Sequence, residues 1–70
     1  MENIIGTTAG EVWRVLSERD NATIMELKAQ LGVSNTLLYL ALGWLLRESK
    51  VTVVPHDHTY IVALIKSDLH

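Results

Sequence analysis

The chain has 70 residues, of which 49% are apolar and 20% are charged. This composition excludes a disordered chain, and the length excludes a second domain, so we expect residues 1–70 to form one small domain. The formal net charge of −2 argues against a nucleic-acid partner, because proteins that bind nucleic acid usually carry a basic patch, and the absence of cysteine excludes disulfides and thiolate catalysis.

The first predicted helix begins near Thr8. Thr8 and Glu11 have the spacing of a capping box, in which the hydroxyl accepts a backbone N–H and the glutamate reaches back to the cap. Apolar residues recur around them at helical spacing, at Ile5, Ala9, Val12, Trp13 and Leu16. The polar residues 18–21 end this pattern. We therefore expect Trp13 to lie in the core.

Two further helices are predicted before residue 50. A second capping box at Thr23 and Glu26 begins a helix of about eight residues, and Gly32 has the position of its left-handed C-terminal cap. Ser34 then caps a third helix, because no residue apart from Gly43 opposes helix formation until about residue 49. The third helix is thus the longest of the three.

A β-hairpin is predicted after the helices. Residues 51–54 are rich in β-branched side chains, and after a break at residues 55–58 the β pattern resumes over residues 59–65. A hairpin alone is only marginally stable in water, and residues 21–23 have room for a very short third strand. The predicted fold class is α+β, in the order α-β-α-α-β-β.

The turn between the second and third helices, followed by a hairpin, resembles the plan of a winged helix-turn-helix domain over nearly the whole chain. Residues 34–45 (SNTLLYLALGWL), preceded by residues 27–32 (LKAQLG) and 9–13 (AGEVW), are similar to a family of very small prokaryotic winged-helix domains of unestablished function. The resemblance implies a winged helix-turn-helix fold. It also implies DNA binding and transcription regulation, because most winged helices insert the third helix into the major groove.

The third helix carries apolar residues on two sides. Its core stripe consists of Leu38, Ala41, Leu42 and Leu45. The opposite side, where a DNA reader places its base contacts, carries Thr36, Leu37, Leu40, Gly43, Trp44 and Arg47, with Tyr39 at the border. Reading bases requires amides and cations, whereas burying a large apolar side chain against a protein stabilises a complex by about 1.5–3 kcal/mol.

The sequence therefore favours a non-enzymatic winged-helix module that binds a protein, most simply as a homodimer. Its predicted anchors are Leu37, Tyr39, Leu40 and Trp44. The alternative is a DNA-binding transcription regulator that uses Ser34, Asn35, Thr36, Tyr39, Arg47 and Lys50.

Three points about this interpretation are open. A helix that is apolar all round can also be central, enclosed by its own domain, in which case Trp44 is core. Gly43 indicates close approach of another backbone, either within the domain or across an interface. A dimer has three candidate surfaces, namely the third helix, the first helix and the free edge of the strand at residues 59–65.

No pattern indicates catalysis or a bound group. Carboxylates are scattered, and no glycine-rich loop follows a strand. His56 and His58, with Asp57 or His70, have only a weak metal-ligand spacing, so we interpret them as solvated loop residues. We predict no enzyme activity, no metal, no cofactor and no small-molecule substrate. Without a signal peptide or an apolar run of ~18 residues, we expect a cytoplasmic protein that makes no membrane contact.

Overall fold

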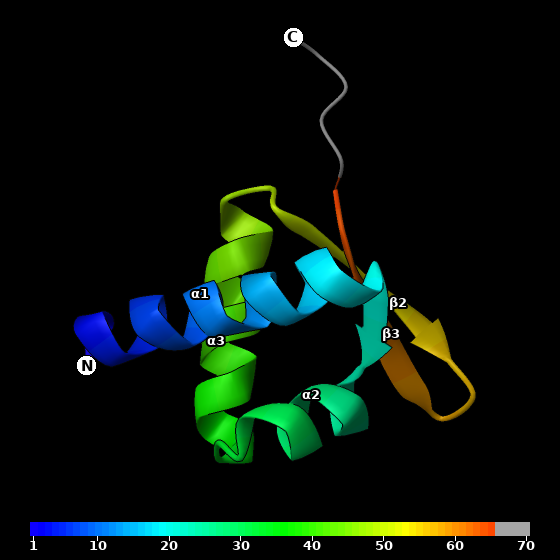
Figure 1. Ribbon diagram of the computed structural model, residues 1–70, viewed down its shortest axis with the longest axis horizontal. Helices are drawn as coiled ribbons and strands as arrows, with labels where there is room; N and C mark the ends of the chain where they lie inside the picture. The colour runs from blue at the N-terminus through cyan, green and yellow to red at the C-terminus, as the bar shows by residue number, and fades with distance from the viewer. Residues whose placement is uncertain (66–70) are drawn as a thin grey trace, which may run out of the picture.

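The computed structural model describes residues 1–65 as three helices and a three-stranded sheet (Figure 1). The elements in chain order are α1 (Glu2–Arg19), β1 (Asn21–Thr23), α2 (Ile24–Leu31), α3 (Asn35–Arg47), β2 (Val51–His56) and β3 (Thr59–Leu64). This order confirms the predicted α+β fold class, in which α2 and α3 form a helix-turn-helix and the β2–β3 hairpin forms the wing. Figure 1 shows α1 crossing α3, with the N-terminus and the wing at opposite ends of the molecule.

Helix α1 is longer than its sequence pattern predicts, and the prediction that the third helix is the longest is wrong. It begins at Glu2, and the capping box predicted at Thr8 and Glu11 is wrong, because Thr8 lies within the helix and is buried. Inside a continuous helix the N–H of Glu11 is bonded to the carbonyl four residues earlier, so no cap is needed. The buried residues of α1 start only at Thr8, and the helix therefore extends beyond the core at its N-terminal end.

Helix α2 begins at the capping box that the sequence predicts. The hydroxyl of Thr23 accepts a hydrogen bond from the Glu26 N–H at 3.1 Å, and the Glu26 carboxylate accepts one from the Thr23 N–H at 2.8 Å. Arg19 at the end of α1 lies 3.1 Å from the same carboxylate. The hydrogen bond from the Thr23 N–H, and then the charge of Arg19, hold the pKa of Glu26 below its ordinary value of 4.5.

The turn from α2 to α3 is fixed by Gly32. Its backbone is left-handed, with φ of 66°, and its N–H donates to the Lys28 carbonyl at 2.8 Å, as predicted for a helix C-terminal cap. Among residues 1–65, no single helix has both the length and the apolar composition for crossing a membrane. The combined pair α2 and α3 does pass that test, and the two helices are bent by 114° relative to each other.

The sheet has the order β1-β3-β2, so β3 is its central strand. The predicted short strand at residues 21–23 is confirmed, since Asn21 pairs with Ala63 and Thr23 with Ile61. The expectation of a free edge along residues 59–65 is therefore wrong, because β1 and β2 are the two edge strands. Pro55, which has no N–H to donate, lies on the edge strand β2.

The hairpin turn is tighter than the four-residue break that the sequence predicts. Residues 55 and 56 belong to β2, and His56 pairs with Thr59, so only Asp57 and His58 form the turn. Both have positive φ, 44° and 66°, the left-handed backbone that two-residue hairpins adopt.

The core lies where the helices meet the inner face of the sheet. It consists of Ala9, Val12, Val15, Leu16, Ala22, Ile24, Leu27, Leu38, Ala41, Leu42, Leu45, Val51 and Val62. The predicted α3 stripe is thus confirmed in full, because all four of its members belong to this set. Trp13 does not, and its predicted place in the core is wrong.

Candidate functional site

Helix α3 is positioned by a cap and by its buried stripe. The Ser34 hydroxyl accepts a hydrogen bond from the Leu37 N–H at 3.1 Å, which confirms the predicted cap. The helix ends at Arg47, slightly before the predicted end near residue 49. Because each residue turns the helix by about 100°, burial of one stripe leaves the other positions of α3 at or near the surface.

Large apolar side chains occupy those outer positions. Tyr39 is 56% exposed, Trp44 is 43% exposed, and Leu40 and Leu46 have similar exposed fractions. Leu37 is half-buried. The interpretation of α3 as a central helix sealed inside its own domain is therefore wrong.

The outer residues of α3 divide into two flanks. Leu37, Leu40 and Trp44 recur at spacings of three and four and form one side, which we call the Trp44 flank. Tyr39, Gly43 and Leu46 recur at spacings of four and three and form the other side, which we call the groove flank. The two flanks are separated by the outermost line of the helix, on which Thr36 and Arg47 lie.

A hollow of about 230 Å³ lies between the groove flank and the wing, and we call it the α3–wing groove. Its lining residues are Ile24, Tyr39, Leu42, Gly43, Leu46, Val53 and Tyr60. None of these side chains carries a charge at neutral pH. Tyr60 and Val53 reach it because alternate residues of the paired strands share one face of the sheet.

Gly43 has no neighbour that explains its small size. A Cβ built at this position meets no heavy atom within 4 Å, and its φ is not positive. Close approach of another backbone within the domain is therefore excluded as the reason for glycine here. In mid-helix, glycine is about 1 kcal/mol less favourable than alanine. Glycine at this position therefore lowers helix stability, and no contact within the subunit explains its presence.

Some of these surface residues could not be anticipated from local pattern. Leu46 was recognisable by its spacing from Tyr39 and Gly43, which places the three on one helix side. Tyr60 gave no such signal, because its place beside α3 depends on the pairing of β3 with β2. Trp13, expected in the core, is 47% exposed on α1.

The residues of the DNA-binding alternative are all at the surface. Ser34, Asn35, Thr36, Tyr39, Arg47 and Lys50 are exposed. Arg47 and Lys50 are the only lysine or arginine residues from Ser34 to the end of the described chain at Ile65. The hydroxyl of Ser34 is already engaged in the helix cap.

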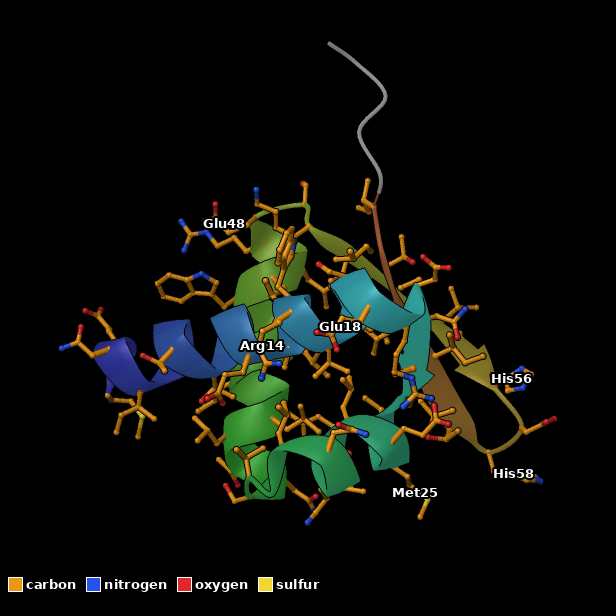
Figure 2. All side chains as sticks on the ribbon, in the orientation of Figure 1. Arg14, Glu18, Met25, Glu48, His56 and His58 are labelled. Carbon is orange, nitrogen blue, oxygen red and sulfur yellow. The ribbon has the colours of Figure 1, made fainter. Side chains whose placement is uncertain are left out.

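The tip of the wing is polar. Figure 2 shows His56 and His58 there, with their side chains pointing away from the body of the protein, and residues 55–60 line a hollow of about 390 Å³. His56 Nε2 lies 3.4 Å from an Asp57 carboxylate oxygen. Within residues 1–65, no three His, Asp or Glu side chains are grouped to hold a metal ion, and His70 lies outside the described residues.

Comparison with known proteins identifies a matching family, a similar protein and a similar solved structure. The sequence profile of a family described as a winged helix-turn-helix domain (DUF2582) matches residues 1–64. The uncharacterized protein MJ1608 of Methanocaldococcus jannaschii is 31% identical over 62 residues, which are 86% of this chain and 89% of that protein. The solution NMR structure of protein BT2368 from Bacteroides thetaiotaomicron has 31% identity and a TM-score of 0.79, covering 100% of this chain and 95% of that one.

Proposed function

Because this chain belongs to the family of winged helix-turn-helix domains, we propose that it is a non-enzymatic binding module whose third helix contacts a protein. In most winged helices the corresponding helix reads DNA. Here its partner is most simply a second copy of the chain. The anchors of the contact are Tyr39, Leu40 and Trp44, with Leu37 at the margin.

The observation that supports this proposal most is the exposure of large apolar side chains along α3. Tyr39, Leu40 and Trp44 each leave about half of their surface in water. Because complete burial of such a side chain contributes about 1.5–3 kcal/mol, covering the exposed part of each adds on the order of 1 kcal/mol. A protein surface supplies that cover, whereas the wet major groove of DNA offers these side chains few partners.

The charge distribution supports a protein partner over DNA. Binding to DNA depends on lysine and arginine side chains that neutralise phosphates and release counterions. Arg47 and Lys50 are the two such residues near the reading face, and Glu48 lies between them. Asn35 and Thr36 provide polar groups at the start of α3, so a DNA-binding regulator is the alternative that the experiment must distinguish.

The test is the substitution Trp44→Glu, which places a charge in the middle of the proposed contact. Sedimentation of the 7.8 kDa chain should show a concentration-dependent dimer for the unaltered protein and a folded monomer for Trp44→Glu. The matched control is Met25→Glu, because Met25 is 75% exposed on α2 and points away from the body (Figure 2). This control should dimerise like the parent.

Two results would contradict the proposal. A parent chain that remains monomeric up to millimolar concentration removes the second copy as the partner. Binding of duplex DNA at pH 7.5 that is lost in Trp44→Glu, with a steep dependence on salt, would instead establish the DNA-binding alternative.

A further inference from the structure

Helix α3 carries a protruding side chain, Trp44, which we call the ridge, and a hollow on its other flank. On the Trp44 flank the indole of Trp44 is 43% exposed. On the groove flank, the absence of a side chain at Gly43 leaves space between Tyr39, Leu46 and the wing. The same helix therefore carries a protruding apolar side chain on one flank and, on the other flank, an apolar hollow that suits such a side chain.

The α3–wing groove has the size and chemistry to receive an aromatic ring. An enclosed apolar cavity of about 150 Å³ is large enough to bind benzene, and the groove offers about 230 Å³. Its lining has no charged side chain, and the hydroxyl groups of Tyr39 and Tyr60 are its only side-chain polar groups. A charged peptide or a nucleic acid would therefore find no counter-charge in it, whereas an indole would bury its ring.

Two-fold symmetry can bring the ridge of one copy to the hollow of another. In a symmetric dimer each contact occurs twice, because residue i of one copy meets residue j of the other and the reverse. If the two α3 helices face each other and run in the same sense, the Trp44 flank of each lies opposite the groove flank of its partner. The outermost line of α3 then lies close to the axis, where Gly43 permits close approach.

The available area suits a weak dimer. Three aromatic residues of this surface, Tyr39, Trp44 and Tyr60, are each about half exposed and together offer on the order of 300 Å². Leu40 and Leu46 are similarly exposed and enlarge this area, and specific interfaces at the low end of the size range bury ~600 Å² per subunit.

We infer that two copies of the chain associate with Trp44 of each seated in the α3–wing groove of the other, about a two-fold axis beside Gly43. This inference rests on the proposed function and specifies its partner and geometry. Trp44 is the anchor, Tyr60 is the outer wall of the groove, and Gly43 is the point of closest approach between the two helices.

The rival surfaces for self-association are α1 and the outer face of the sheet. Gly10 and Trp13 lie at a spacing of three on the exposed side of α1, and Val54 is 53% exposed on β2. Neither Trp13 nor Val54 lines the α3–wing groove. Cysteine variants on both surfaces test these alternatives.

Single-cysteine variants locate the axis, because the parent chain contains no cysteine. A disulfide forms only where two Cα atoms lie within about 7 Å of each other. Gly43→Cys should give a covalent dimer on mild oxidation, with no clash inside the subunit. Gly10→Cys, Val54→Cys and the control Met25→Cys should remain at least about tenfold less cross-linked.

A second measurement follows the anchor itself. In a Trp13→Phe background Trp44 is the remaining tryptophan of the chain, and its emission should shift to shorter wavelength as the dimer forms. Tyr60 is half-exposed, and the substitution Tyr60→Lys places a positive charge in the α3–wing groove. It should abolish that shift and raise the dimer dissociation constant by about 30-fold or more, as expected for loss of an interface hot spot.

The outcomes separate the inference from the function on which it rests. A dimer that is lost in Trp44→Glu but retains its affinity in Tyr60→Lys supports the interaction face and overturns the groove seating. Efficient cross-linking of Gly10→Cys or Val54→Cys in place of Gly43→Cys moves the axis to another surface and overturns the inference. A chain that is monomeric at all concentrations overturns the inference and removes the second copy as the partner of the proposed contact.

Discussion

Glu26 joins the end of α1 to the start of α2 through a hydrogen bond with Thr23 and an ion pair with Arg19. These partners favour its ionised form, so its pKa is lower in the folded chain than the ordinary value of 4.5. A carboxyl group of this kind stabilises the fold fully above its unfolded pKa. The contribution is lost as the pH falls below about 4.5 and through the lower folded value.

Glu26→Gln should therefore destabilise the protein at pH 7, and this effect should decrease as the pH falls below 4.5. At neutral pH the substitution removes the charge that Arg19 and the Thr23 N–H stabilise, whereas in progressively stronger acid the parent carboxyl loses that charge through protonation. Urea unfolding at several pH values measures the difference between the two proteins. A difference that stays constant across this range would show that the charge of Glu26 does not contribute.

Single residues were predicted well where a backbone bond defines their role and poorly where packing does. Thr23, Gly32 and Ser34 act as caps, as their sequence positions predict. Thr8 has the same local pattern as Thr23, yet it is buried within a helix. The capping pattern at Thr8 does not reveal whether the preceding residues are helical. The apolar spacing around Trp13 likewise did not show that this residue, at the margin of its stripe, lies outside the core.

The helical elements α1 and α3 both contain exposed glycines whose Cβ positions are free of neighbours. Alanine should therefore be accommodated at Gly10 and at Gly43 without a clash, and it favours helix by about 1 kcal/mol. Gly10→Ala and Gly43→Ala should each raise the unfolding free energy of the monomer by up to this amount. Urea unfolding at low micromolar concentration measures that gain.

The same pair of variants separates helix stability from association. Gly43→Ala adds a methyl group where the two α3 helices approach each other, so it should weaken the dimer while stabilising the monomer. Gly10→Ala should leave the dimer dissociation constant unchanged. Equal dimer dissociation constants for both variants would show that Gly43 does not lie at the contact.

Elements were predicted to the extent that their signals are local. The helices α2 and α3 and the strands β2 and β3 were predicted from caps, spacing and β-branched runs, which describe neighbouring residues. The strand β1 was expected only because a hairpin alone is marginally stable. The place of β3 between β1 and β2 was missed because it joins residues 21–23 to residues 61–63, far apart in sequence. The α3–wing groove depends on how the β2–β3 hairpin packs beside α3, which brings together segments far apart in sequence, so the wing side of the candidate site could not be predicted from local patterns.

At the scale of the whole molecule, the net charge of −2 predicts how the chain meets nucleic acid. At pH 7.5 and about 0.1 M salt we expect no binding of a labelled duplex at 10 µM protein, measured by fluorescence anisotropy. Sequence-selective binding at pH 7.5 would contradict this prediction.

The central position of β3 has a consequence for the order in which the fold forms. This strand contains Val62, which is fully buried, and it pairs with both β1 and β2. The three helices precede β3 in the chain, so helical structure can form before β3 is synthesised. The sheet and the part of the core around Val62 form only after β3 is available to pair with the two edge strands.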